Sequence, residues 1–339
     1  MQPLQNALAK IPLVDLRGHT PLELLFLYRR QAHILLDGAL SLVGKGPGYV
    51  LAHATDRASK RWLEKANNPY LTEISLIAEA MHRPGAYVLN TCLEWGCTSG
   101  AWNSEQGPIL RRVLDWPFPR LGEFPVVAHF NGRLGDYFNV TWPGFVGVLQ
   151  AMAPGRFAAA INQAPRRKHA GGFVGAWIAG RFKTGSSLAL PPVHLLRRVF
   201  ETARDYSAAK SMLCLSPLAV PAIFTLSGTR PGEACVIERT EDGYATREMG
   251  SGRVCAANQF HSPLGASELG WKARPIDSPG RFRQAMGLSA SDNDFSWFLP
   301  PIANVNSRLA VIANAATGRL KVMGTAGTIP VTEIFDLTA

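Results

Sequence analysis

The segment from Thr91 to Gly100 contains the side chain best suited to nucleophilic chemistry, the thiol of Cys97. Gly96 precedes this cysteine, and Arg112 and Asp115 follow it 15 and 18 positions later. A free thiol has a pKa of about 8.5, so it is mostly protonated at neutral pH and needs a base before it can attack. The pattern therefore indicates a nucleophile with a charged residue of each sign close by.

We hypothesise that the base appears when the bond between Gly96 and Cys97 is cut. The new α-amine of Cys97 would have a pKa of about 7.7–8.0 and would be held beside the sulfur. Asp115 would orient this amine, and Arg112 would favour the thiolate or an anionic intermediate. Attack of the thiol on its own strained peptide bond gives an ester-like intermediate that water opens. Gly96 tolerates the backbone angles that such strain requires.

A tetrahedral intermediate also needs fixed donors aimed at its oxyanion, such as a backbone N–H and a neutral side-chain amide. Asn258, at the end of a predicted strand, suits that role. Structural alternatives remain open for each residue. Cys97 would then be a buried thiol, Arg112 and Asp115 an ion pair, and Asn258 a satisfied strand end.

The residues before this site are expected to be mainly helical. Apolar spacing, capping residues and prolines predict helices over 19–43, 56–66 and 70–81, with a turn at Gly44–Gly48. The composition changes between residues 85 and 97. We therefore predict a helical N-terminal segment over 1–96 and a separate core over 97–339.

The core is expected to contain antiparallel strands with two helices between them. Short β-type runs separated by turns, such as Asn131–Gly132, favour a meander. The predicted strands are 125–130, 137–142, 144–152, 157–162, 222–227, 234–239, 253–258, 307–314 and 319–324, the last two forming a hairpin. Helices are predicted over 191–205, 207–215 and 281–286. This order indicates a layered α+β domain.

The composition excludes several classes of protein. The chain has 339 residues, 47% of them hydrophobic, and a net charge of +10 that is scattered as short basic clusters. It has no long basic stripe with interleaved aromatics, so no nucleic-acid partner is expected. Five cysteines without CxxC spacing argue against a disulfide framework and a zinc site, and no cofactor or metal is expected. Neither a signal peptide nor an apolar run of about 20 residues is evident, which predicts a cytoplasmic location without stable membrane insertion.

Several segments with recognisable motifs follow one another in a specific order. They are Pro69–Glu79, Asn90–Glu94, Cys97–Ser99, Arg112–Trp116, Trp142–Val148, Arg156–Asn162, Pro191–Arg198, Gly228–Glu233, Ala257–His261 and Ser278–Arg281. In these segments the chain, from about Tyr70 to its end, resembles the N-terminal-nucleophile amidases related to acid ceramidase and N-acylethanolamine-hydrolysing acid amidase. The wider kin of that family include isopenicillin-N acyltransferase and the choloylglycine hydrolases.

The resemblance implies a four-layer αββα sandwich, autoproteolytic maturation between Gly96 and Cys97, and hydrolysis of a linear amide C–N bond. It assigns site residues by position. Cys97 would be the nucleophile, Asp115 the acid that orients its amine, Arg112 the active-site arginine, Asn258 the oxyanion donor and Arg281 a support behind them. For Arg281 the alternative is a surface charge at the start of a helix.

The chain departs from the family pattern at two places. Val113 stands where an Asn is usual between the Arg and the Asp. Asn162 and Gln163 stand where the ceramidase branch favours a Glu followed by an Arg. We therefore expect a backbone contact with the oxyanion region at Asn162 and Gln163, without a catalytic carboxylate.

Aromatic residues near the site are candidates for substrate binding. Trp116, Trp142 and Phe145 would wall an acyl-binding cleft, and their alternative is a place in the core. His129, His194 and His261 are expected to be structural, because this mechanism has no task for an imidazole.

The leading hypothesis is an autoprocessing cysteine amidase that acts on a small-molecule N-acyl amide through a Cys97 acyl-thioester. One alternative keeps the site but passes the acyl group to an amine, which makes an acyltransferase. The other is an unprocessed, catalytically silent binding protein of the same fold. The expected partners are the substrate and the protein's own cleaved N-terminal segment, with a homodimer as a further option.

Overall fold

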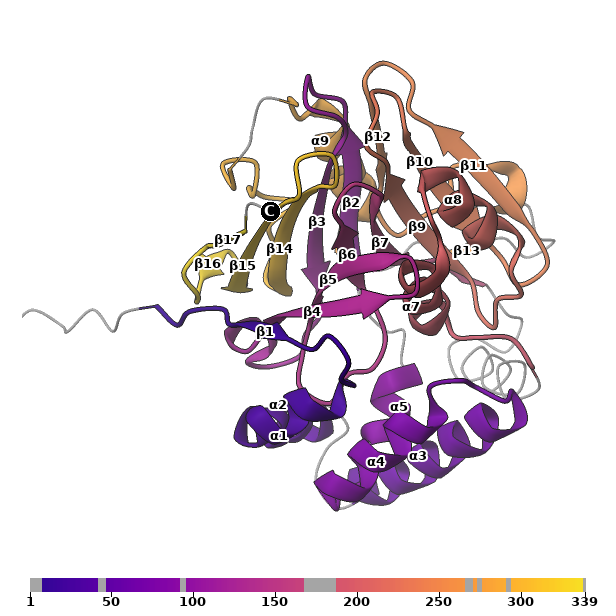
Figure 1. Cartoon of the computed structure of the whole chain (residues 1–339), viewed down its shortest axis with the longest axis vertical. Coiled ribbons are helices and arrows are strands. Elements are labelled where there is room, and N and C mark those ends of the chain that lie inside the picture. The colour runs from indigo at the N-terminus through magenta and orange to yellow at the C-terminus, as the bar shows by residue number, and fades with distance from the viewer. Residues whose placement is uncertain are drawn as a thin grey trace, which may run out of the picture.

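Two β-sheets lie face to face in the computed structural model of this chain (Figure 1). The structure describes residues 8–41, 47–91, 96–167, 187–265, 271–272, 276–290 and 294–337. Helices cover the outer face of each sheet, so the layers follow the order helix, sheet, sheet, helix. This confirms the predicted αββα sandwich.

The first sheet has eight strands in the order β1-β4-β5-β6-β7-β9-β10-β11. All neighbours are antiparallel except β1 and β4, which run parallel. The strands are β1 (Leu13–Asp15), β4 (Val126–Gly132), β5 (Gly135–Thr141), β6 (Gln150–Ala153), β7 (Phe157–Gln163), β9 (Ala222–Ser227), β10 (Ala234–Arg239) and β11 (Tyr244–Glu248).

The second sheet is antiparallel and carries the start of the proposed core, with strand order β12-β2-β3-β14-β15-β16 and β17 paired to β15. Its strands are β2 (Gly96–Trp102), β3 (Ile109–Asp115), β12 (Arg253–Ala256), β14 (Ser307–Asn314), β15 (Arg319–Ala326), β16 (Ile329–Pro330) and β17 (Phe335–Leu337). A separate ribbon pairs β8 (Arg166–Arg167) with β13 (Trp271–Lys272).

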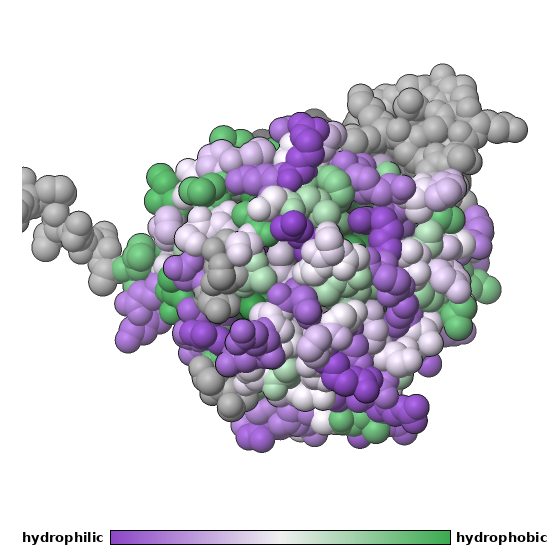
Figure 2. All heavy atoms as spheres, turned by 90° about the horizontal axis from the view of Figure 1, so that it is seen from above, coloured by the Kyte–Doolittle hydropathy of each residue, from purple (hydrophilic) through white to green (hydrophobic). Residues whose placement is uncertain are grey.

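Apolar side chains from both sheets fill the space between them. Phe224 of the first sheet and Leu114 and Val311 of the second are buried in one common cluster, which also contains Cys97. Because successive side chains of a strand point to opposite faces, the inward positions form a continuous core. In Figure 2, polar residues cover much of the upper face, and hydrophobic residues there form small separate groups.

Buried arginines fix the helices on the first sheet. α7 (Pro192–Thr202) and α8 (Tyr206–Leu215) cover its outer face. Arg156 donates to carbonyl oxygens at the end of α7, and Arg239 does the same at the end of α8. A cation at a helix C-terminus satisfies free carbonyls and complements the helix dipole. On the other sheet, α9 (Ser278–Gly287) packs against β2 and β12.

The N-terminal helices form a group of their own below the sandwich (Figure 1). They are α1 (Leu22–Leu27), α2 (Arg29–Ser41), α3 (Pro47–Lys65), α4 (Leu71–Met81) and α5 (Ala86–Thr91). Leu25, Leu36, Leu63 and Ile74 share one buried cluster, which also includes Val146 of the sandwich. Among the described residues, no helix is both long and apolar enough to cross a membrane.

Several predicted boundaries were wrong. The described part of the predicted helix 19–43 contains two helices, α1 and α2, and α3 begins nine residues before the predicted start at Asp56. Residues 44–46 of the predicted Gly44–Gly48 turn lie outside the described residues, and residues 47 and 48 begin α3 instead of ending a turn. Asn131 and Gly132 end β4, and the turn follows at residues 133–134. Only residues 150–152 of the predicted strand 144–152 are a strand, as part of β6. The elements that were not predicted include α5, β1, β2, β3, β8, β11, β13, β16 and β17.

Candidate active site

Cys97 is the second residue of β2 and is fully buried between the two sheets. In the ladder between β2 and β3, Gly96 pairs with Asp115 and Ser99 pairs with Arg112. The hairpin therefore brings together the residues that the sequence spacing singled out. A Cβ atom on residue 96 would lie 3.3 Å from the Cβ atom of Asp115 and 3.7 Å from Oδ1 of Asn258. A side chain at this position would therefore be tightly packed against Asp115.

Arg112 connects the thiol to the opposite sheet. Its Nη2 atom lies 3.2 Å from Sγ of Cys97 and 3.1 Å from the carbonyl oxygen of Ile161 in β7. The side chain is fully buried, and its Nε and Nη1 atoms have no hydrogen-bond partner in the described part of the chain. Burial raises the pKa of the Cys97 thiol, and the positive charge of Arg112 only partly opposes this. In the uncut chain the thiol is therefore protonated at neutral pH.

Asn258 binds the backbone nitrogen of Cys97. The N–H of Cys97 donates to Oδ1 of Asn258 at 2.9 Å. The amide nitrogen of Asn258 donates in turn to the carbonyl oxygen of Gln163 at 2.8 Å, and its backbone N–H donates to Oγ of Ser278 at 2.9 Å. The amide is fully buried and lies directly against the nitrogen that cleavage would convert into an amine.

Asp115 is held by residues from two other elements. Oγ of Ser307 donates to Oδ1 of Asp115 at 2.7 Å, and Nη1 of Arg281 lies 3.5 Å from Oδ2. Burial raises the pKa of Asp115, while the Arg281 charge and the Ser307 hydrogen bond act in the opposite direction. Arg112 and Asp115, both within the described chain, do not pair with each other, so the ion-pair alternative for them is wrong.

Arg281 lies under the first residues of β2 and is fully buried. It donates to the carbonyl oxygen of Cys97, to Oγ1 of Thr98 at 2.9 Å and to Oδ1 of Asn258 at 2.8 Å. Its Nε donates to the carbonyl oxygen of Ile276 at 2.7 Å. The alternative of a surface charge is therefore wrong, because this guanidinium joins three of the candidate residues.

Asn162 and Gln163 end β7 on the opposite side of the site. The amide nitrogen of Asn162 donates to the carbonyl oxygens of Ala256 and Ala257, each at 3.1 Å, which fixes the chain just before Asn258. Gln163 contributes its carbonyl oxygen to Asn258. The side-chain oxygens of Asn162 and Gln163 are buried and have no partner in the described chain. In the described chain, neither residue forms a hydrogen bond with Cys97. Gln163 binds Asn258 itself, and Asn162 binds the two residues before Asn258.

Trp116, Trp142 and Phe145 line one apolar cavity of about 80 Å³. It lies between the N-terminal helices and the sandwich, because Ala32 and Leu36 of α2 and other residues of α4 and α5 complete its wall. Nε1 of Trp142 donates to the carbonyl oxygen of Leu121 at 2.8 Å, so this indole is fixed. The three aromatic residues thus line one cavity, and Trp116 is the residue that follows Asp115 in the chain.

The sequence interpretation missed several residues that hold this site. Thr98 accepts a hydrogen bond from Arg281, and Ser307 donates one to Asp115. Ser278 accepts from the backbone N–H of Asn258 and donates to the side chain of Gln259. Thr98 is next to Cys97, but no spacing signal points to the two serines. The structure describes no group of three metal-binding side chains. His194 is buried at α7, away from these contacts, and hydrogen-bonds to Asn68.

No family model matches the chain, but about half of its sequence matches curated proteins. It is 37% identical to acid ceramidase of Heterocephalus glaber over 199 residues, which are 52% of this chain and 49% of that protein. It is 28% identical to N-acylethanolamine-hydrolyzing acid amidase of Cavia porcellus over 185 residues, or 52% of this chain and 50% of that protein. The chain thus spans about half the length of the curated relatives it matches.

The solved structure of the Caenorhabditis elegans N-acylethanolamine-hydrolyzing acid amidase ortholog shows the same fold. It superposes with a TM-score of 0.51 at 15% identity and covers 71% of this chain and all of that one. The chain is thus similar to acid ceramidase over about half of its length, and it shares the fold of the N-acylethanolamine-hydrolyzing acid amidase ortholog.

Proposed function

We propose that this protein is an amidase that cuts itself between Gly96 and Cys97 and then hydrolyses the linear amide bond of an N-acyl substrate. The observation that carries the proposal is the position of Cys97. Its thiol lies against Arg112 and its backbone nitrogen against Asn258, both within hydrogen-bond distance. The printed names of the relatives describe a ceramidase and an N-acylethanolamine amidase, both of which act on N-acyl amides.

Self-cleavage would begin when Sγ of Cys97 attacks the carbonyl carbon of Gly96. The bond from this carbon to the nitrogen of Cys97 breaks, the nitrogen leaves with the thiol proton, and a thioester joins Gly96 to the sulfur. Water then hydrolyses the thioester to a carboxylate and a free thiol. A side chain on residue 96 would fit tightly against Asp115, whereas glycine leaves the carbonyl carbon of residue 96 less crowded.

The new α-amine supplies the base that the buried thiol lacks. Burial keeps the pKa of Cys97 high in the uncut chain, so Arg112 alone does not ionise it. A neutral amine beside the sulfur takes the thiol proton, and the thiolate attacks the substrate carbonyl. The amine half of the substrate leaves with that proton. Water hydrolyses the acyl-thioester and releases the acid, which restores the thiol.

Asn258 and Arg112 are the groups placed to stabilise the charged intermediates. One amide hydrogen of Asn258 is used by Gln163, and the second is available to an oxyanion. Arg112 keeps two buried nitrogens without partners in the described chain, which favours an anion beside the sulfur. Arg281 positions the others, since it binds the carbonyl oxygen of Cys97, Oδ1 of Asn258 and Asp115.

The apolar cavity suits the acyl part of the substrate. Aromatic and aliphatic side chains line it, and Trp116 follows Asp115 directly in the chain. Small-molecule sites are mostly apolar with a few placed polar groups. In the cleaved protein, residues 1–96 and 97–339 would remain associated as two chains, because each contributes one wall of this cavity.

Mass spectrometry of the denatured protein tests the maturation step. We expect two fragments that meet between Gly96 and Cys97 in the wild type, and a single chain in Cys97→Ala. Cys214→Ala, which changes a buried free cysteine on α8, should be cut like the wild type. A single intact chain in the wild type would refute self-cleavage. Labelling of Cys97 by an amide-mimicking electrophile tests the nucleophile separately.

A further inference from the structure

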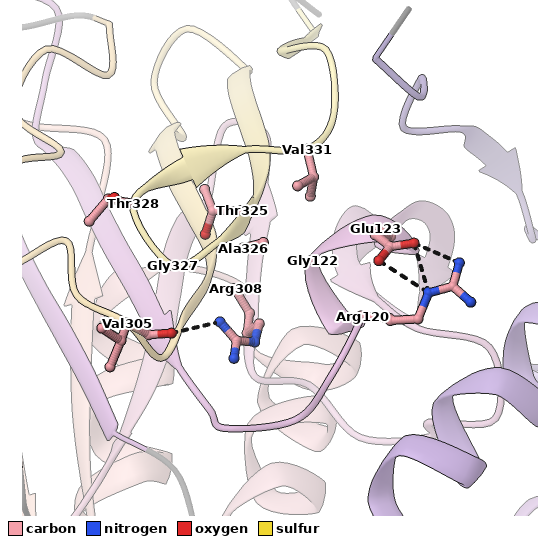
Figure 3. A pocket seen from close by; sticks show the side chains of 10 residues that line it. All are labelled: Arg120, Gly122, Glu123, Val305, Arg308, Thr325, Ala326, Gly327, Thr328 and Val331. Atoms are coloured by element: carbon pink, nitrogen blue, oxygen red, sulfur yellow. Dashed lines mark hydrogen bonds and ion pairs between the residues drawn. The ribbon is translucent and has the colours of Figure 1, made fainter. Parts of the chain in front are cut away.

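A second, polar pocket of about 390 Å³ opens beside the sandwich (Figure 3). It lies between the 3₁₀ helix η1 (Leu121–Glu123) and the ends of β14 and β15. Its lining residues are Arg120, Gly122, Glu123, Val305, Arg308, Thr325, Ala326, Gly327, Thr328 and Val331. None of them lines the apolar cavity or contacts Cys97, so the proposed amidase mechanism leaves this pocket without a role.

One cation in the lining of this pocket has no ion pair in the described chain, although the charge of Asp115 acts on it: burial lowers its pKa, and Asp115 opposes this shift. Arg120 and Glu123 neutralise each other through contacts of 2.7–3.1 Å. Arg308 is the remaining charged residue of the lining, and it makes no ion pair within the described residues. Its Nε donates to the carbonyl oxygen of Phe118 at 2.9 Å, and its Nη1 donates to those of Val305 and Ser307. These bonds fix the guanidinium and leave Nη2 without a hydrogen bond in the part of the chain that is described.

Thr325 adds an unsatisfied hydroxyl to the same pocket. Its side chain is fully buried, and Oγ1 has no hydrogen-bond partner among the residues that the structure places. In Figure 3 this oxygen points from β15 toward the side of the pocket that holds Arg308. A buried hydroxyl without a partner is costly and therefore rare in a native fold. Its presence in the wall of a pocket indicates a group that binds there.

The backbone around the pocket is fixed by close packing. A Cβ atom on Gly122 would lie 2.0 Å from the carbonyl oxygen of Thr325, so η1 presses directly on β15. The pairing of β14 with β3 shifts register between Ser307 and Leu309, which makes Arg308 part of a β-bulge. Bulges redirect side chains and are frequent next to functional sites. Here the bulge lies one residue from Ser307, which holds Asp115.

We propose that this pocket binds a small organic anion whose carboxylate or phosphate group contacts Arg308. A guanidinium held by fixed hydrogen bonds is preorganised for an oxyanion, and Thr325 supplies a second donor. The volume lies within the range of small-molecule sites, which leaves space for an organic part beyond the anionic group. The proposal is independent of the amidase activity.

Calorimetric titration and thermal melting of the full chain test the site, with inorganic phosphate and acetate as probes and sodium chloride at equal ionic strength as the baseline. We expect saturable binding and a raised Tm with at least one probe. Arg308→Gln should abolish both effects. Thr325→Val should weaken binding on the order of tenfold, since it removes one hydrogen bond to a charged group.

Two control measurements distinguish binding at this site from a general effect of the protein's charge. Arg319→Gln, which changes a half-exposed arginine on β15 outside the pocket, should bind the probes like the wild type. Thr325→Val removes a hydroxyl that has no partner in the described chain, so its Tm without anion should be unchanged or higher. The proposal is overturned if neither probe binds saturably to the wild type. It is equally overturned if Arg308→Gln and Thr325→Val bind as the wild type does.

Discussion

The backbone nitrogen of Cys97 lies 2.9 Å from the side-chain oxygen of Asn258, although 161 positions separate the two residues in the chain. This contact joins the start of β2 to the residues after β12, its neighbour in the second sheet. The contact holds the backbone nitrogen of Cys97. In the proposed mechanism, cleavage converts this nitrogen from an amide into the amine that serves as the catalytic base.

Asn258→Asp separates the two tasks of this side chain. The carboxylate can still accept from Cys97 and Arg281, but it cannot donate to Gln163 or to an oxyanion. We expect the two fragments to form, with a kcat for amide hydrolysis that is about 10²–10³-fold lower. Mass spectrometry measures the first result and a product assay the second. An unchanged kcat would contradict the role of Asn258 as an oxyanion donor.

Arg281→Met should be strongly destabilising. The change leaves Asp115 without its buried cationic partner and removes the donors to Cys97 and Asn258. Loss of one partner of a buried pair costs about 3–5 kcal/mol. Urea denaturation measures the loss in the free energy of unfolding. Arg283→Met, on an exposed position of the same helix, is the control and should change stability by less than about 0.5 kcal/mol.

Arg197→Met should loosen the N-terminal segment after cleavage. Arg197 of α7 is bound to Glu73 of α4 at 2.6 and 3.0 Å and to Glu201 at 2.8 Å. The partly buried contacts with Glu73 join the N-terminal helices to the sandwich without a covalent bond, while the contact with Glu201 lies within α7. Gel filtration of the cut protein should show the small fragment eluting separately. The neighbouring exposed Arg198→Met should keep both fragments together, and equal retention in both variants would contradict the role of Arg197.

Ala32→Leu tests the apolar cavity. Ala32 is buried on α2 and lines the cavity, whose lining does not include Cys97, so a larger side chain at this position reduces the space in the cavity. We expect roughly a tenfold or greater rise in KM for a long acyl chain, and little change for an acetyl amide. Initial rates with the two substrates give the comparison. Equal changes for both would exclude the cavity as the acyl site.

His194 should make the fold sensitive to acid. Burial, and to a smaller extent Arg197, lowers the pKa of this imidazole from 6.5 to about 3. Between these values the unfolded chain binds a proton that the folded chain excludes, so stability falls as the pH falls through this window. The slope contributed is at most about 1.4 kcal/mol per pH unit.

His194→Asn provides the measurement. Its side-chain oxygen can accept from Asn68, as Nδ1 of His194 does at 2.9 Å, but it does not titrate. Urea denaturation at several pH values between 3.5 and 6.5 should therefore give a smaller pH slope for the variant. Identical slopes for the two proteins would show that His194 does not titrate on unfolding.

The sequence by itself indicated a layered α+β domain and a nucleophile at Cys97 with Arg112 and Asp115 near it, whereas the αββα order was implied only by the family resemblance. Cys97, Arg112 and Asp115 lie on the adjacent antiparallel strands β2 and β3, which were not among the predicted strands, so their spacing alone did not establish that they meet. The hairpin of β14 and β15 was predicted, because its apolar runs flank a turn. Local periodicity carries this information, since strand pairing across a short connection follows from neighbouring residues.

Only the tertiary structure decided how the site is held. Arg281 is 184 positions from Cys97, and Ser307 is 192 positions from Asp115, so no local pattern could reveal their contacts. From the sequence alone, an isolated arginine at the start of a helix is expected to be a surface charge, and only the packed structure shows that Arg281 is buried. The apolar cavity and the polar pocket likewise arise where distant segments meet, because a cavity is a property of packing between elements and not of any one of them.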